Sequence, residues 1–79
     1  MKVRIKLIAT YQKLLPQGTP GNVIELDVPA GITVSEVLAR FDVPLDDSSV
    51  IVVNGLTVPL ETELVENDTV TAFSAIAGG

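Results

Sequence analysis

The ten residues from Ile32 to Phe41 read ITVSEVLARF and contain the clearest structural signal in this chain. Thr33 is followed three residues later by Glu36, the spacing of a capping box, in which each side chain binds a backbone N–H that the start of a helix leaves unpaired. Apolar residues then recur every three or four positions, and Pro44 follows, where a helix cannot continue. These apolar residues are Val34, Val37, Leu38 and Phe41. We therefore predict one amphipathic helix over 33–41.

Alternating apolar and polar residues indicate strands on both sides of this helix. Residues 3–9 and 24–28 alternate with the period of two that is typical of a strand with one buried face. After the helix, Asn54-Gly55 separates two apolar runs and predicts a tight hairpin turn. A turn at 66–68 then precedes a last strand over 70–74. This order predicts an α+β domain of the β-grasp (ubiquitin-like) fold, with a mixed sheet of about four to five strands and one main helix packed across one face.

Length and composition indicate a single small domain with little catalytic chemistry of its own. The 79 residues include no cysteine and no histidine, so thiolate chemistry and the commonest general base are missing. The first ten residues interleave charged and apolar side chains, unlike a secretory signal peptide, and no apolar run approaches the ~20 residues of a membrane span. We expect a cytoplasmic protein with no bound metal, whose catalysis takes place in partner enzymes.

Charge is distributed unevenly along the chain. Four of the five basic residues lie within the first thirteen positions, whereas all ten acidic residues lie from Glu25 onward. An acidic body repels phosphate backbones and anionic lipid headgroups, and it attracts a basic protein surface. We therefore expect a protein partner, no nucleic acid and no membrane.

The chain ends in Ile76-Ala77-Gly78-Gly79. Because glycine has no Cβ, such an end can enter a narrow channel and present its terminal carboxylate inside another protein's active site. That carboxylate is ionised at neutral pH and can attack the α-phosphate of ATP where an enzyme supplies metal and positive charge. We predict a β-grasp domain at 1–74 and a flexible tail at 75–79, with Gly79 as the reactive residue and Gly78, Ala77 and Ile76 as partner contacts.

Phe73 is a further candidate for contact with a partner. If Val70 and Ala72 face the helix, the period of two sends Phe73 to the outer face of the sheet, where an exposed aromatic residue marks a contact surface. A shift of one residue would instead bury Phe73 in the core, and the sequence leaves both possibilities open. The same two interpretations apply to Leu56, Val58 and Leu60.

Four segments together resemble the ubiquitin-like sulfur-carrier family, which includes the small subunit of molybdopterin synthase (MoaD) and the thiamine-pathway sulfur carrier (ThiS). They are the helix at 33–41, the Val-Val-Asn-Gly turn ending at Gly55, residues 64–68 and the Ala77-Gly78-Gly79 end. The resemblance implies that a ubiquitin-activating-like adenylyltransferase adenylates the terminal glycine, and that a persulfide converts it to a thiocarboxylate. It also implies that ATP, with zinc or magnesium, is held by that partner and that this chain binds no cofactor.

Several acceptors and two other functions remain open at this point. The resemblance to the molybdopterin branch implies sulfur transfer in the active site of the molybdopterin synthase large subunit, whereas the thiamine branch implies thiazole synthase. Ser74-Ala75 stands where the molybdopterin branch often has two prolines. The alternatives are a carrier in the thiamine or another sulfur pathway, a ubiquitin-like modifier that forms isopeptide bonds, and a purely structural interaction module.

Overall fold

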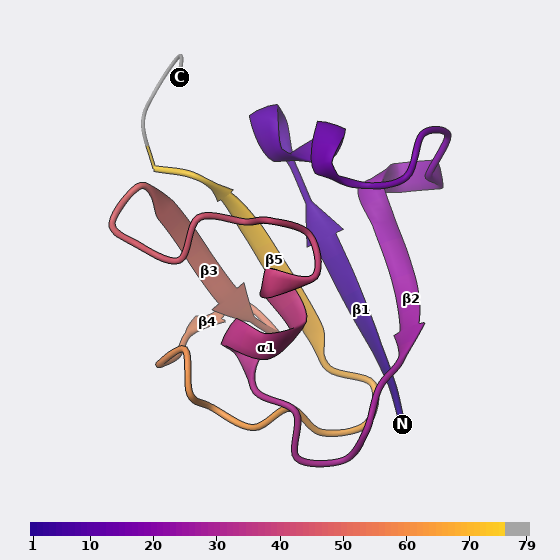
Figure 1. Ribbon diagram of the computed structural model, residues 1–79, viewed down its shortest axis with the longest axis vertical. Coiled ribbons are helices and arrows are strands. Elements are labelled where there is room, and N and C mark those ends of the chain that lie inside the picture. The colour runs from indigo at the N-terminus through magenta and orange to yellow at the C-terminus, as the bar shows by residue number, and fades with distance from the viewer. Residues whose placement is uncertain (76–79) are drawn as a thin grey trace.

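One helix lies across one face of a five-stranded sheet (Figure 1). The computed structural model describes residues 1–75. This arrangement is the β-grasp fold that the order of elements predicts. In chain order the elements are β1 (Lys2–Leu7), the 3-10 helices η1 (Ala9–Leu14) and η2 (Pro20–Asn22), β2 (Val23–Asp27), α1 (Val34–Ala39), β3 (Ser49–Val53), β4 (Leu56–Thr57) and β5 (Thr69–Ser74).

The last strand of the chain occupies the centre of the sheet. The strand order is β2-β1-β5-β3-β4, so β5 lies between β1 and β3. The pairing of β1 with β5 is parallel, and all the other pairings are antiparallel. Parallel neighbours need a long crossover connection, which here contains every other element of the fold. The last strand therefore lies in the middle of the sheet, with β2 and β4 at the two edges (Figure 1).

The core lies between the sheet and α1. Burial along β1 alternates without exception, and Val3, Ile5 and Leu7 are all fully buried. From α1, Val34, Val37 and Leu38 are fully buried as well, as the predicted apolar stripe requires. Burial of side chains of this size stabilises a fold by about 1.5–3 kcal/mol each.

The capping box forms as predicted at the start of α1. The Thr33 hydroxyl accepts a hydrogen bond from the Glu36 N–H at 3.2 Å, and Glu36 Oε1 accepts one from the Thr33 N–H at 2.9 Å. Two of the N–H groups that a helix start leaves unpaired are thereby satisfied.

The C-terminal end of α1 differs from the prediction of a helix over 33–41. The helix ends at Ala39, and Phe41 lies beyond it, partly buried against the core. Asp42 adopts a φ of 60°, a left-handed conformation that turns the chain, and the Val43 N–H bonds to the Leu38 carbonyl. The local turn therefore ends the helix before Pro44 can.

The predicted hairpin turn forms at Asn54-Gly55. Both residues have positive φ, 52° and 84°, as a two-residue turn between antiparallel strands requires. The strand that follows, β4, has only two residues, which makes it shorter than the predicted apolar run at 56–58.

Candidate functional site: the end of the central strand

The C-terminal end of β5 is held in place by the strand beside it. Ser74 pairs with Ser49 of β3, and the Ala75 N–H donates to the Ser48 carbonyl at 2.8 Å. Ser48 directly precedes β3 and Ala75 directly follows β5, so this bond continues the pairing of the two strands by one step. Residues 76–79, on which the predictions for Ile76, Ala77, Gly78 and Gly79 fall, lie outside the described residues.

The residues on the β3 side of this contact are fixed by two further side chains. Tyr11, from η1, places its hydroxyl 2.6 Å from Ser49 Oγ and donates toward the Ser48 carbonyl at 3.4 Å. Asp46 accepts hydrogen bonds from the Ser48 hydroxyl and, at 2.9 Å, from the Ser48 N–H. Those two bonds, the one from the hydroxyl foremost, hold the pKa of the exposed Asp46 carboxyl below its usual value.

Phe73 lies on the face of the sheet that α1 does not cover. Val70 and Ala72 are fully buried on the α1 side, so the alternation along β5 places Thr71 and Phe73 on the other side. Phe73 is half-buried there and pairs with Val50 of β3. The structure therefore places Phe73 on the outer face of the sheet and not in the core. Contact of Phe73 with a partner stays a prediction.

The same outer face carries three of the five basic residues. Lys2, Arg4 and Lys6 alternate with the buried residues of β1, and Lys6 pairs with Thr71 beside Phe73. Arg4 also lies 3.6 Å from Glu25 on β2, in an exposed ion pair worth little by itself. Asp27 and Glu25 of β2 pair with Lys2 and Arg4 on this face, whereas Lys6 pairs with Val23, so Lys6 is the cation of β1 that has no carboxylate opposite it on β2.

The other apolar candidates divide between surface and core. Leu56 is 69% exposed at the start of β4, whereas Val58 and Leu60 are partly buried against the core. Only Leu56 of the three is therefore available as a contact residue at an open surface.

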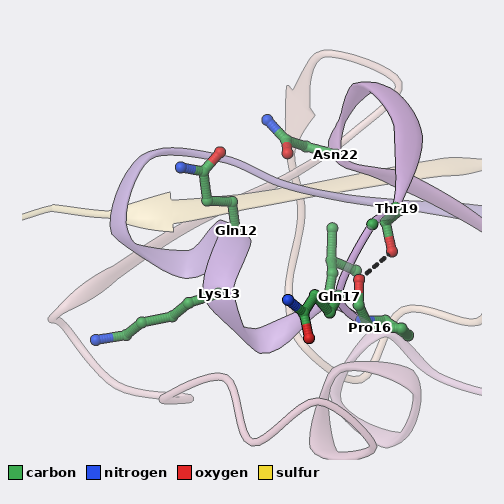
Figure 2. A pocket seen from close by; sticks show the side chains of 8 residues that line it. Gln12, Lys13, Pro16, Gln17, Thr19 and Asn22 are labelled. Atoms are coloured by element: carbon green, nitrogen blue, oxygen red, sulfur yellow. Dashed lines mark hydrogen bonds between the residues drawn. The ribbon is translucent and has the colours of Figure 1, made fainter.

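A hollow near η1 has a polar lining but no catalytic pair. Figure 2 shows the carboxamides of Gln12, Gln17 and Asn22 around it, with the Lys13 side chain extending away from the loop of Pro16. The Thr19 hydroxyl donates to the Pro16 carbonyl and closes that loop. Its lining residues include no carboxylate to act as a general base.

Neither a metal site nor a membrane span is found within residues 1–75. No three Asp or Glu side chains come together there as a metal site would need. The helices in this part of the chain are all too short or too polar to cross a bilayer.

The sequence model of the ThiS family matches residues 5–79, which is nearly the whole chain and includes its end. The chain belongs to the ThiS family. No curated protein matches the sequence of this ThiS-family chain.

Solved structures share the fold of this ThiS-family protein. Small archaeal modifier protein 1 from Haloferax volcanii has a TM-score of 0.78 at 19% identity, with all of both chains covered. A second structure of that protein has a TM-score of 0.75 at 18% identity, and the match covers 95% of this chain and 98% of the other. A Pyrococcus furiosus protein named as molybdopterin converting factor subunit 1 has a TM-score of 0.75 at 24% identity, and the match covers 95% of this chain and 98% of the other. At these identities the likeness concerns the fold.

Two features of the ThiS-family site were missed by sequence reasoning. The alternation of Lys2, Arg4 and Lys6 was visible, but its place beside Phe73 depends on the parallel pairing of β1 with β5. The contact of Tyr11 with Ser49 joins residues 38 positions apart, and no local pattern signals it.

Proposed function

We propose that this protein is a sulfur carrier that acts through the carboxylate of Gly79, and that it serves as the small subunit of molybdopterin synthase. The observation that carries this proposal is the position of β5, a central strand from which the chain continues into Ile76-Ala77-Gly78-Gly79. Membership of the ThiS family supports the carrier function. The fold shared with the Pyrococcus furiosus protein is compatible with the molybdopterin branch.

The proposed chemistry consists of two transfers at Gly79. In the first, a carboxylate oxygen attacks the α-phosphorus of ATP, the bond to pyrophosphate breaks, and an acyl-adenylate forms. In the second, a persulfide sulfur on a partner attacks the acyl carbon and AMP leaves. A further thiol of the partner then cleaves the S–S bond, which leaves a thiocarboxylate on Gly79 and a disulfide on the partner. The persulfide and the thiol belong to partner enzymes, because this chain has no cysteine. In this proposal the adenylating enzyme also holds ATP and its metal.

The outer face of the sheet is the proposed docking surface for the adenylating enzyme. Phe73 and Val50 form a cross-strand apolar pair on that face, and Lys6 lies one strand away. An apolar pair with one lysine beside it fits a partner surface that has an apolar centre and a carboxylate at its edge. The acidic body of the chain led us to expect a basic partner, whereas Lys6 favours an acidic group at this one point of contact.

Adenylation of Gly79 is the step that tests the proposal most simply. We expect the protein to support exchange of labelled pyrophosphate into ATP when it is mixed with a ubiquitin-activating-like adenylyltransferase from the same genome. The matched control is the chain without Gly79, which keeps the β-grasp domain and should give no exchange. Equal exchange with and without Gly79 would contradict the proposal.

A second function, protein modification through the same terminus, is favoured by one observation. The two solved structures of small archaeal modifier protein 1 share this fold over nearly all of both chains. A modifier would form isopeptide bonds between Gly79 and lysines of target proteins. Adducts of higher mass that survive thiol reductants and disappear when Gly79 is deleted would favour modification over sulfur transfer.

A further inference from the structure

Tyr11 is attached to the end of the central strand although it belongs to a different part of the chain. The Ile8 N–H extends the pairing of β1 with β5 by bonding to the Ala72 carbonyl at 3.3 Å. Ala9 then adopts a φ of 54°, an unfavourable conformation for a residue with a Cβ, and the chain turns into η1. This turn brings Tyr11 to the end of the sheet at which β5 ends, and Figure 1 shows η1 and the end of β5 at that same end.

The Tyr11 hydroxyl makes two contacts. It lies 3.4 Å from the Ser48 carbonyl oxygen, which can only accept. In the 2.6 Å contact with Ser49 Oγ, either hydroxyl can be the donor. The Ser48 carbonyl also accepts from the Ala75 N–H at 2.8 Å. Tyr11 and Ala75 thus share one acceptor.

We propose that Tyr11 is a positioning residue, which holds the Ser48–Ser49 backbone and through it fixes Ala75, the last described residue before the reactive end, for presentation to the adenylating enzyme. The inference rests on the proposed function, because it assigns a role in presenting Gly79. It is needed because the last hydrogen bond of a strand opens most easily. Each time the Ala75 bond opens, Ala75 gains conformational freedom, and fixing it on the enzyme costs more conformational entropy.

The position of the contact separates this role from ordinary core packing. The Tyr11 ring is 9% exposed and belongs to the core, whereas Ser48 and Ser49 are only half-buried. Replacing Tyr11 by phenylalanine keeps the ring and removes only the oxygen. Ser49→Ala removes the other hydroxyl, and Ser49→Thr keeps a hydroxyl at the same place.

The test combines amide hydrogen exchange with adenylation kinetics. We expect Tyr11→Phe to speed hydrogen exchange of the Ala75 N–H roughly three- to tenfold, which is the effect of losing one hydrogen bond. Exchange of the Val70 and Ala72 N–H groups should change no more than exchange in the rest of the core. With the adenylyltransferase, the KM for the carrier should rise by a similar factor while kcat stays unchanged. Ser49→Ala should reproduce both effects, the double variant should add little, and Ser49→Thr should restore the parent values.

Thr33→Ala is the matched control, because it removes a hydroxyl from the capping box at the start of α1. It should lower the melting temperature without changing the KM or Ala75 exchange. The positioning role is overturned if Tyr11→Phe leaves both quantities at the parent value, or if Thr33→Ala raises the KM equally. In either case the unaltered chain is still adenylated and the proposed function stands. If the unaltered chain is not adenylated at all, the proposed function and the positioning role both fail.

Discussion

Asn54 donates a hydrogen bond from Nδ2 to Oδ1 of Asp68 across 2.8 Å. The bond joins the hairpin turn to the turn before β5, two of the segments on which the family resemblance was based. Asn54 Oδ1 also accepts from the Thr69 N–H at 3.0 Å, and Asp68 Oδ2 accepts from the Val65 N–H at 2.8 Å. Asp68 is the buried polar residue among those described, and its bonds with Asn54 Nδ2 and the Val65 N–H give each carboxylate oxygen a partner. The two turns therefore act as one structural unit.

Breaking this unit should destabilise the fold. We expect Asp68→Ala to lower the free energy of unfolding by about 1–3 kcal/mol, because it leaves the Asn54 amide and the Val65 N–H without an acceptor. Asn54→Ala should cost a similar amount, and the double variant less than the sum of the two. Urea unfolding of the four proteins measures this coupling. Additive effects would show that the two residues act independently.

The core should be sensitive to the loss of a single side chain of α1. Leu38 is fully buried between the helix and the sheet. Leu38→Ala should therefore reduce the free energy of unfolding by about 2–5 kcal/mol through the cavity that it leaves. Leu56→Ala, at a site that is 69% exposed, is the control and should change stability little. Thermal unfolding that ranks the two variants in the opposite order would contradict the assignment of the core.

Local patterns predicted the helix start and the hairpin turn because both depend on residues within four positions of each other. Thr33 and Glu36 meet in one turn of helix, and Asn54 and Gly55 supply the positive φ angles themselves. The end of α1 was predicted too late, because the apolar period continues to Phe41 while Asp42 already turns the chain. The spacing of apolar side chains does not show where the backbone turns out of the helix.

Contacts between distant strands lay beyond what the sequence could predict. The face of Phe73 follows from Val70 and Ala72 once their burial is known, but the pattern allowed either face. Placing Lys6 beside β5 requires the parallel pairing of the first and last strands. Such pairings depend on the packing of the whole domain. Bringing two distant strands together costs conformational entropy, and the burial of the complete core offsets that cost.

The capping box predicts how stability changes at low pH. The Thr33 N–H, and then the Thr33 hydroxyl, lower the pKa of the Glu36 carboxyl below its ordinary value, because both bonds favour the charged form. The stability that Glu36 contributes is therefore present above the unfolded-state pKa and is lost as the pH falls through the lowered folded-state pKa. We expect Glu36→Gln to melt at a temperature that changes less between roughly pH 5 and pH 3 than that of the parent. Glu61→Gln, at an exposed site outside the helix, is the control and should follow the parent curve.

We expect the outer face of the sheet to contribute to binding of the adenylating enzyme. Phe73→Ala should weaken binding to the adenylating enzyme severalfold, while Leu56→Ala, an exposed apolar residue on β4, should not. Lys6→Glu should also weaken binding, most strongly at low salt, whereas Arg40→Glu makes the same change of charge at the C-cap of α1 and should have little effect. Calorimetric titration at two salt concentrations checks both pairs. If Leu56→Ala weakened binding as much as Phe73→Ala, and Arg40→Glu as much as Lys6→Glu, the outer face would not be the contact surface.

A bulky residue near the terminus should abolish activation and leave the domain folded. Gly78 is expected to enter a narrow channel in the adenylating enzyme, where a side chain would not fit. Gly78→Leu should therefore support no pyrophosphate exchange while it melts within a degree or so of the parent, since terminal residues add little to a core. The melting curve is the control. Full exchange by this variant would rule out a narrow channel.

The most direct measurement is the intact mass of the protein after incubation with ATP, the adenylyltransferase and a persulfide sulfur source. We predict a mass increase equal to the replacement of one oxygen by sulfur, located at Gly79 by fragmentation, and no change in the chain that lacks Gly79. An unchanged mass in the presence of an enzyme shown to be active, or sulfur located at any other residue, would contradict the proposal that this protein carries sulfur at its C-terminus.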